Sequence, residues 1–548
     1  MKRFSYILIV LIGLAGVSCD DFLDKLPDNR AEIKTPKQVS LLLVNGYSEG
    51  NYALLGELSS DNVIDNNSPD DKGMRHNVPA FNKMDDEVYA WEDVVSSDQQ
   101  DSPSEVWVGA YHAIAVANHA LEAIKKFEEE GRGSEVRAQK GEALLIRAYN
   151  HFILVNVFAQ AYRNEKLSAN DPGIPYITEP ERKVMVIKER ISVDSVYKLI
   201  EKDLLAGLPL INDAMYEVPK YHFNRAAANA FAARFFLFKK DYDKAIEYAS
   251  AVLEPNPALM MRKWWSITFP TSMAQRLEWI NAAETSNLML IATHSIFARR
   301  YNSSPRYAIN RDALNGTIYS RGPTWSGSHP CFRGRLYISW MGQEYGVFFL
   351  AAVGELFEYT DKIAGIGYPR IVRPEFTAEE TLLCRAEAYI YQERFDKALE
   401  DLKVWDKARQ NLPTQATFSP FTEAAIQSLY RPTQTLLVKT LNTTKMDPAW
   451  TISERQEYFL HCVLHFRRIE TISNGMRWFD VKRYGIELEH KIGTSRVETL
   501  TWDDPRRALQ LPAEVIAAGM EPNDRRIKVE ELPEDAYILL VSPNVEVE

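Results

Sequence analysis

The stretch AAANAFAARFFLFKKDYDKAIEYASAVLEPNP (226–257) decides how most of this chain is expected to fold. Small and aromatic residues recur in it at helical spacing, with Ala233 and Ala245 as the small residues and Phe236 and Tyr242 as the aromatic ones. This pattern predicts two helices packed as a hairpin. Small side chains let two helices approach closely, and the aromatic rings fill the groove beside them.

The stretch LLCRAEAYIYQERFDKALEDLKVW (382–405) repeats the pattern, with Ala386, Tyr389, Phe395 and Ala398 at the same offsets. Both stretches match the spacing of a tetratricopeptide repeat. A single repeat of this kind cannot bury its apolar face, so at least three units are expected. Because the two stretches lie far apart in the chain, we expect an interrupted array rather than a tandem one.

Helical periodicity also runs through the segments on either side of these stretches. The helix pair at 105–162 and the pair that begins near 454 are weaker candidates for further units, and Ser192 is expected to cap a helix over 192–211. The sequence therefore predicts a fold dominated by α-helices. Its repeat scaffold occupies about 105–257 and 376–485.

Two long regions lack this periodicity, namely 56–104 and 258–375. The first is rich in Asp, Asn, Ser and Pro, and the second carries many aromatic residues among Gly and Pro. Disordered segments are poor in aromatic residues, and long ordered loops usually serve a function. We interpret both regions as ordered loops that face a ligand.

The chain begins with features of an export signal. Lys2 and Arg3 precede an apolar run from Phe4 to Val17, which is too short to span a bilayer as a helix. Residues 1–18 are therefore predicted to be a signal peptide. Cys19 follows directly, in the arrangement of a bacterial lipobox, and we expect it to be lipidated and to anchor the protein. The alternative is an ordinary signal peptide followed by an incidental cysteine.

Charge and cysteine content exclude some classes of function. The chain has 64 Lys and Arg against 75 Asp and Glu, a formal net charge of −11, which argues against a nucleic-acid partner. Apart from Cys19 there are only Cys331, Cys384 and Cys462, too few for a disulfide framework. Cys384 and Cys462 lie in helical patterns, and we expect them to be small core residues.

Motifs for catalysis are weak throughout. The glycines at 365–367 do not form a phosphate-binding loop, no G-x-S-x-G motif occurs, and carboxylates are abundant without forming an identifiable pair. His461 and His465 are one helical turn apart and could share a zinc ion, but no third ligand is evident, so helix packing is the favoured interpretation. No metal and no cofactor are expected. Whether calcium orders the Asp- and Asn-rich loop at 61–71 is left open.

Aromatic residues in the irregular regions are the better functional signal. A sugar offers a flat C–H face ringed by hydroxyl groups, so its site needs an exposed aromatic ring with Asp, Asn or Arg nearby. The alternative for each ring is packing in the core. The expected ligand-binding residues come from three clusters and one separate position. They are Tyr89 and Trp91 in DEVYAWED, Arg299, Tyr301 and Asn302 in ARRYNSSPRY, Trp325 in RGPTWSGSH, and Asp61 on its own.

Several stretches, in this order and spacing, resemble the SusD/RagB-type family of surface lipoproteins. They are SCDDFLDKLP, VWVGAYHAIAVANHALEAI, RAYNHFILVNVFAQAY, GIPYI, VDSVYKLIEKDLLAGLPLI, the two repeat stretches above, ISERQEYFLHCVLHFRRIETISNGMRWFDVKRYG and ALQLPAEVIAAGMEPN. The family's closing Q-N-P-G-Y is absent, and its D-x-R reads Asp361-Lys362-Ile363. The family's ligand loops vary most, so no binding residue transfers by motif.

This resemblance implies a single SusD-like domain over 19–548, with four tetratricopeptide-like hairpins and a large loop-rich insertion. It implies a non-catalytic protein, lipid-anchored at the cell surface in the outer membrane, that acts as a lid on a SusC-type TonB-dependent transporter and delivers oligosaccharides to it. Three alternatives remain at this point. They are a receptor for peptides or glycopeptides, a surface glycoside hydrolase with two carboxylates in a cleft, and a helical-repeat adaptor that binds only its protein partner.

Overall fold

The computed structural model describes residues 33–69, 73, 75, 78, 82–95, 100–181, 188–263, 272–303, 306–325, 336–340, 347–350, 354–410, 419–431 and 437–526. The predicted signal peptide, Cys19 and Cys331 lie outside these ranges.

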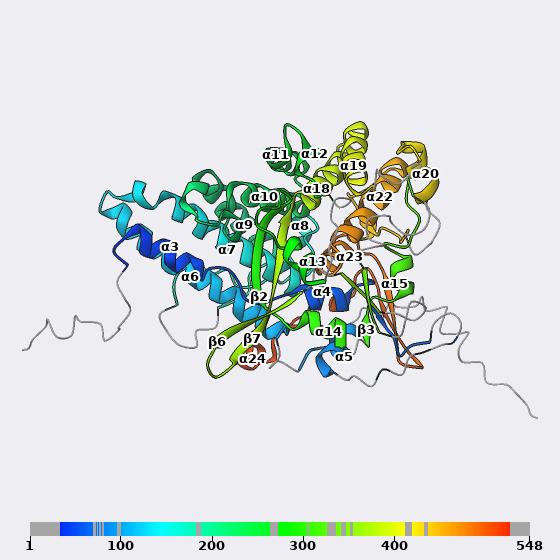
Figure 1. Cartoon of the computed structure of the whole chain (residues 1–548), viewed down its shortest axis with the longest axis horizontal. Coiled ribbons are helices and arrows are strands. Elements are labelled where there is room, and N and C mark those ends of the chain that lie inside the picture. Colours follow the sequence, from blue (N-terminus) through cyan, green and yellow to red (C-terminus); the bar gives the residue numbers. More distant parts are fainter. Residues whose placement is uncertain are drawn as a thin grey trace, which may run out of the picture.

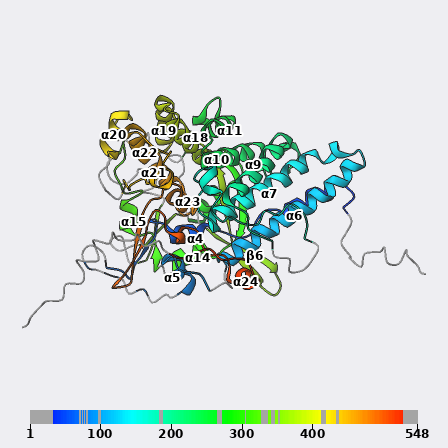
Figure 2. The same ribbon diagram turned by 180° about the vertical axis from the view of Figure 1, so that it is seen from behind.

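Long helices form the scaffold of the protein and follow one another across the molecule from α6 to α22 (Figure 1). In both views α7 lies between α6 and α9, and it packs against both of them (Figure 2). The scaffold helices are α6 (Pro103–Glu129), α7 (Arg137–Phe158), α9 (Val193–Gly207), α10 (Arg225–Lys239), α11 (Tyr242–Leu253), α18 (Ala378–Tyr391), α19 (Phe395–Arg409), α22 (Glu454–Glu470) and α23 (Met476–Arg483).

Both predicted repeat stretches form helical hairpins. α10 packs against α11 and α18 packs against α19, while α11 also packs against α18. The two stretches that lie far apart in the sequence are therefore neighbours in space, which confirms the interrupted array. Ala233, Ala245, Ala386 and Ala398 are fully buried, as the close approach of the helices requires. The prediction of a helix-dominated fold is confirmed.

Local signals place the ends of these helices. The hydroxyl of Ser192 accepts a hydrogen bond from the backbone N–H of Ser195, so the predicted cap of α9 is confirmed. Asn224 caps α10 in the same way. Lys240 adopts a left-handed conformation with φ of 66°, and this residue turns the chain from α10 into α11.

Shorter helices surround the scaffold and connect it. They are α3 (Pro36–Val44), α4 (Ala53–Ser59), α5 (Lys83–Tyr89), α8 (Glu165–Ser168), α12 (Pro257–Met260), α13 (Ser272–Trp279), α14 (Phe297–Ser303), α15 (Arg311–Asn315), α20 (Glu423–Tyr430), α21 (Thr443–Met446) and α24 (Ala513–Ala517).

The region 258–375, which we expected to be irregular, contains an antiparallel sheet of order β2-β7-β6. Its strands are β2 (Asn287–His294), β7 (Ile366–Thr377) and β6 (Glu355–Asp361). The apolar run of β2 is typical of a buried strand, but Pro369, Pro374 and Gly367 interrupt the strand pattern of β7. The described residues also form two-stranded pairs: β1 (Ile64–Asp65) with β3 (Tyr307–Ala308), β4 (Leu336–Trp340) with β5 (Val347–Leu350), and β8 (Leu488–Ile492) with β9 (Arg496–Leu500).

A network of buried ion pairs joins the sheet to the helices of the core. Arg467 on α22 lies 3.1 Å from Asp480 on α23 and 3.3 Å from Glu380 on α18. Arg234 on α10 lies 2.8 Å from Glu375 on β7 and 3.3 Å from Glu380. These side chains are almost completely buried, so the network ties four helices and one strand together inside the core.

Cys384 and Cys462 are buried free cysteines, as predicted. The thiol of Cys384 donates a hydrogen bond to Glu380 in the same network. Within the described ranges, no helix is both long enough and apolar enough to cross a membrane.

Replacing Arg467 with methionine is expected to lower the free energy of unfolding by about 3–5 kcal/mol, because the buried carboxylates of Asp480 and Glu380 lose their cation. Urea denaturation followed by circular dichroism measures this loss. Arg526→Met is the matched control, since that arginine pairs with Asp524 in the solvent, and it should leave the unfolding midpoint unchanged. Equal midpoints for both variants would contradict a stabilising role of the network.

Candidate functional site

Tyr89 and Trp91, two predicted ligand contacts, lie in the core. Their rings are 1% and 4% exposed and enclose the imidazole of His490, with centroid distances of 4.1 and 4.0 Å. The indole N–H of Trp91 donates to the backbone carbonyl of Ser59 at 3.0 Å. This burial corrects the prediction that Tyr89 and Trp91 offer an exposed ring face to a sugar, because contacts within the protein already occupy both rings.

Trp325 is also a packing residue in this structure. It is 6% exposed, and its indole N–H donates to the carbonyl of Ser320 at 2.9 Å. Its ring centroid lies about 6 Å from those of His465 and Phe466 on α22. Here too the ring turns inward rather than toward a ligand, which corrects the prediction that Trp325 stacks on a sugar.

Asp61 is surrounded by cations of the protein itself. Its carboxylate lies 2.8 Å from Arg477, 2.9 Å from Lys439 and 3.4 Å from Arg468. Burial alone would raise the pKa of Asp61, but these three cations hold it well below the ordinary value. The carboxylate thus serves to pair buried charges, and this geometry does not present it to a sugar.

The third predicted cluster lies on α14. The guanidinium of Arg299 is half exposed and holds the carboxylate of Glu355 on β6 through two contacts of 2.7 and 2.5 Å. The side chains of Tyr301 and Asn302 fall outside the described part of the structure. For these two residues, ligand binding stays a prediction.

The histidine pair on α22 matches the packing interpretation. The two ring nitrogens of His465 lie 2.7 Å from the Tyr430 hydroxyl and 2.8 Å from the Ser320 hydroxyl, and His461 is buried nearby. No group of three potential metal ligands occurs among the residues that the structure describes.

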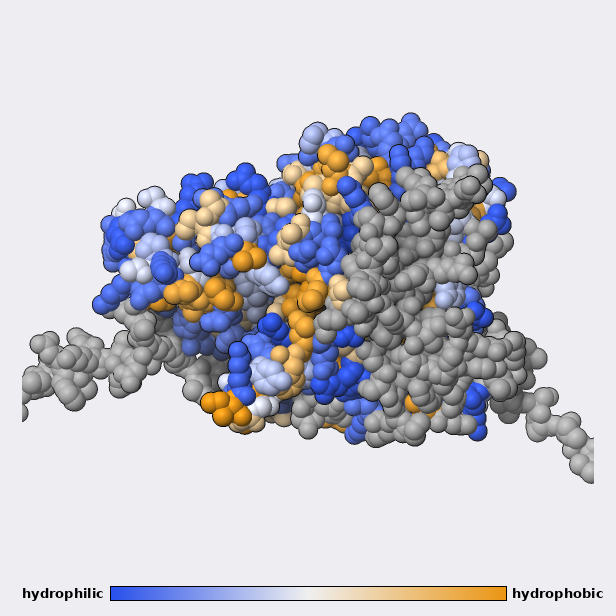
Figure 3. Space-filling view, in the orientation of Figure 1, coloured by the Kyte–Doolittle hydropathy of each residue, from blue (hydrophilic) through white to orange (hydrophobic). Residues whose placement is uncertain are grey.

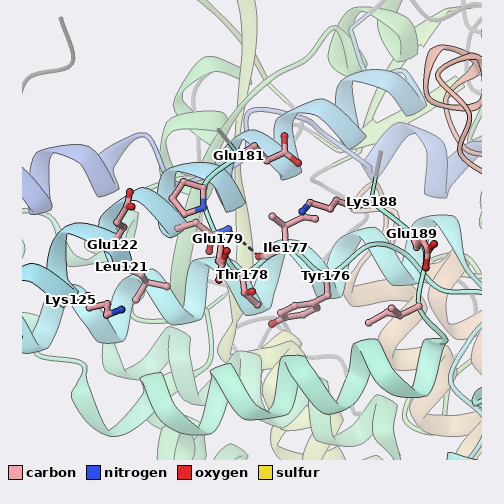
Figure 4. A pocket seen from close by; sticks show the side chains of 13 residues that line it. Leu121, Glu122, Lys125, Tyr176, Ile177, Thr178, Glu179, Glu181, Lys188 and Glu189 are labelled. Carbon is pink, nitrogen blue, oxygen red and sulfur yellow. Dashed lines mark hydrogen bonds between the residues drawn. The ribbon is translucent and has the colours of Figure 1, made fainter. Parts of the chain in front are cut away.

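A groove of about 930 Å³ runs along α6 (Figure 4). Side chains from α6 form one wall, and two segments at 176–181 and 188–191 form the rest. Carboxylates, amines and a few apolar groups share this lining. The lining residues are Asn118, Leu121, Glu122, Lys125, Tyr176, Ile177, Thr178, Glu179, Pro180, Glu181, Lys188, Glu189 and Ile191.

Buried polar groups from three helices fix the floor of this groove. Arg147 on α7 forms a two-point ion pair with Asp203 on α9, with both distances 2.7 Å. The Tyr176 hydroxyl donates to the same carboxylate at 2.6 Å. Arg147 also donates to Asn118 on α6 at 3.0 Å, so the groove wall, the floor and the scaffold form one connected network.

His151 on α7 completes the floor. Its imidazole stacks on the ring of Tyr176 with a centroid distance of 3.7 Å. The backbone N–H of Ile177 donates to its Nε2, so the proton of the neutral ring lies on Nδ1 and is donated to the carbonyl of Arg147. Burial lowers the pKa of His151 to about 3, which keeps the ring neutral at physiological pH.

A smaller apolar pocket of about 240 Å³ adjoins the groove. Its lining includes Trp107, Tyr111 and Ile114 from α6, together with Val515 and Met520 at and beyond α24. The groove and this pocket share lining residues, so polar and apolar surfaces meet along α6. Such an arrangement can bind a ligand that has both hydroxyl groups and apolar faces.

Sequence reasoning missed this groove, although a signal was present. Asn118, Arg147 and Asp203 are polar residues at positions that face the core of three predicted helices. Buried polar residues of this kind need partners, and their partners here build the groove floor. The predicted periodicity rests only on the apolar positions of these helices and therefore does not draw on these polar residues.

Acidification should lower the free energy of unfolding through His151, because this histidine binds a proton at a higher pH in the unfolded chain than in the native protein. With a pKa of about 6.5 in the unfolded state, the stabilising contribution of neutral His151 is present above that pH and is lost as the pH falls toward 3. Between pH 7 and 4.5 we expect wild-type protein to lose roughly 2 kcal/mol more unfolding free energy than His151→Asn.

Urea denaturation at the two pH values measures this difference. His112→Asn, at an exposed histidine of α6, should behave as the wild type does. Parallel losses in wild type and His151→Asn would contradict the neutral, buried imidazole.

Comparisons with known proteins agree with this fold. A family model described as "Starch-binding associating with outer membrane" (SusD-like) matches residues 21–237. No curated protein sequence matches the chain significantly.

Solved structures share the fold over most of the chain. A SusD superfamily protein from Bacteroides thetaiotaomicron is 17% identical, with a TM-score of 0.59, and the match covers 90% of this chain and 100% of that one. One from Bacteroides fragilis is 16% identical, with a TM-score of 0.61 and coverage of 89% and 99%. A putative sugar-binding protein from Bacteroides vulgatus is 18% identical, with a TM-score of 0.59 and coverage of 90% and 99%.

Over residues 21–237 this chain is similar to the SusD-like family, and over most of its length it shares the fold of the solved SusD superfamily structures.

Proposed function

We propose that this protein captures oligosaccharides at the cell surface without catalysing a reaction, and that it passes them to a TonB-dependent transporter in the outer membrane. The observation that carries this proposal is the family match, whose description names starch binding and the outer membrane. Solved structures of the same fold support it, since their names include a putative sugar-binding protein and a SusD-like carbohydrate-binding protein.

The groove along α6 is the concave surface that best suits a sugar chain. Carboxylates such as Glu122 and Glu181 can accept hydrogen bonds from hydroxyl groups, and Lys188 can donate to them. Trp107 and Tyr111 line the adjoining pocket, where they can contact the apolar face of a sugar. Because the floor is fixed by the Arg147 and His151 contacts, little ordering entropy is lost when a ligand binds.

The lipid anchor is proposed to form at Cys19. The apolar run from Phe4 to Val17 precedes it, and Asp20 and Asp21 follow, in the arrangement that resembles surface lipoproteins. Acyl chains contribute about 0.8 kcal/mol per buried methylene, so several chains hold a protein durably at a membrane. The mature protein would then face outward as a lid on its transporter.

Cys19→Ala should abolish the acylation of the protein when it is expressed in a Gram-negative host. Metabolic labelling with a palmitate analogue measures the incorporation of acyl chains. After cell fractionation, the variant should be found in the soluble fraction instead of the outer membrane. Cys331→Ala controls for labelling at another cysteine. A variant that keeps both label and membrane location without Cys19 would contradict the anchor.

The test of ligand class is a binding screen of the soluble chain from Asp20 onward. Host, plant and microbial oligosaccharides and a mixed peptide pool are presented, and bound oligosaccharides are recovered and sized. Binding of an oligosaccharide that is recovered with its length unchanged supports the proposal. Binding of peptides alone would indicate a peptide receptor, and shortened oligosaccharides would indicate a glycoside hydrolase.

Ala115→Trp is expected to weaken oligosaccharide binding about tenfold or more, because the indole would fill the apolar pocket that Ala115 lines. Isothermal titration with the strongest ligand of the screen measures the change. His112→Trp places the same side chain at an exposed position of α6 outside the groove and should bind normally. Unchanged affinity in Ala115→Trp would exclude the pocket as the site and leave sugar binding itself intact.

A further inference from the structure

The hairpin of β6 and β7 concentrates exposed hydrophobic side chains in one place. It projects at the lower left of Figure 1, and the same corner of the surface is hydrophobic in Figure 3. Phe357 is 44% exposed, Tyr359 52%, Ile363 100% and Ile366 60%. Scattered exposed apolar residues are ordinary, but a contiguous cluster marks an interaction surface.

Two aromatic rings stand side by side on β6. Phe357 and Tyr359 are separated by one residue, so they lie on the same face of the strand. Their ring centroids are 4.8 Å apart at an interplanar angle of 67°, which is an edge-to-face arrangement. Opposite them on β7 are Pro369 and Gly367, so no large side chain from β7 covers the pair.

Gly367 is required for this arrangement. A Cβ atom at that position would come within 2.8 Å of the Phe357 ring and 2.0 Å of the backbone oxygen of Glu358. The ring of Phe357 therefore lies against the bare backbone of β7. Leaving two such rings half exposed forgoes part of the stabilisation that burying a large apolar side chain contributes, so the surface is one that a ligand can complete.

Charged groups border the two rings on the same face. Glu355 precedes Phe357 by two residues, and Arg299 on α14 holds its carboxylate in a fixed position. A carboxylate in this geometry keeps lone pairs that can accept hydrogen bonds from hydroxyl groups. The sequence pattern predicted that Arg299 binds a ligand beside an aromatic ring of its own segment. In the structure Arg299 instead contacts Glu355, on the strand that carries the exposed rings of Phe357 and Tyr359.

The tip of the hairpin is held by its own hydrogen bonds. Asp361 accepts from the backbone N–H groups of Ile363 at 2.8 Å and Ala364 at 2.9 Å, and Gly365 adopts φ of 68°. Thr360 donates to the carbonyl of Ile366 at 3.2 Å. The rings therefore sit on a preformed hairpin, which limits the entropy lost on binding.

From these observations we propose that Phe357 and Tyr359 form a second oligosaccharide-binding surface, separate from the groove, on which a sugar ring stacks while Glu355 and Arg299 contact its hydroxyl groups. The proposal rests on the proposed function and adds a site to it. Two contact points along one polymer raise its apparent affinity through effective concentration, without stronger contacts at either point.

A peptide could instead pair with β6, which is an edge strand of its sheet. Such pairing would use the backbone groups of β6 and would depend little on aromatic side chains. The edge-to-face rings with a fixed carboxylate beside them favour a sugar, because stacking needs the π face and the hydroxyl groups need an acceptor.

The test uses the full mature protein and an oligosaccharide array that includes maltoheptaose, the α-glucan suggested by the starch-binding description of the family. The strongest ligand of the array is then titrated against Phe357→Ile and Tyr359→Ile. Isoleucine keeps apolar bulk and strand preference but removes the ring. Each variant is expected to bind about three- to tenfold more weakly, as the loss of one stacked ring implies.

Two controls separate stacking from general damage. Ile363→Ala truncates the most exposed apolar residue of the same hairpin and should bind normally, and Tyr359→Phe keeps the ring and should lose little. Thermal unfolding midpoints of all variants should agree with the wild type, because the substituted side chains are exposed.

Each outcome decides a different point. Wild-type affinity in both isoleucine variants would overturn the hairpin site while sugar capture stands. No oligosaccharide binding by the wild type would overturn the proposed function, and the hairpin site with it. Peptide binding that persists in both isoleucine variants, without sugar binding, would overturn both the hairpin site and the proposed sugar capture.

Discussion

The fold depends on the buried cluster of charges around Arg467. A buried guanidinium is costly to remove from water, and only well-placed carboxylates make its burial tolerable. Here Glu380 and Asp480 provide that compensation from α18 and α23, while Arg234 extends the cluster to Glu375 on β7. Each helix and strand that contributes a charge is constrained in position and rotation. This constraint joins the two halves of an array that the sequence separates.

The groove along α6 repeats the same principle on a smaller scale. Arg147 and Asp203 pair with each other and hold the lining residues Asn118 and Tyr176, and His151 stacks on Tyr176. In both places, buried polar groups that pair with one another specify one arrangement of helices.

The parts of this fold that follow from short-range patterns could be predicted from the sequence. The α10–α11 hairpin and the Ser192 cap depend on residues within one or two helical turns of one another. The orientation of Trp91 could not be predicted. Its ring turns inward because the backbone at Trp91 is left-handed, with φ of 54°, and because His490, about 400 residues away, stacks on it. The sheet was missed since Pro369 and Gly367 break the alternation of β7.

The strand β7 runs without interruption from the exposed hairpin to the charged core. Side chains alternate along it, so a slip by a single residue would turn Glu375 away from Arg234 and leave a buried carboxylate facing apolar neighbours. Such a slip would also displace every partner of β6 by one position. The pairing register between β6, which carries the exposed rings, and β7 is therefore fixed by the ion pair of Glu375 with Arg234 at the buried end of β7.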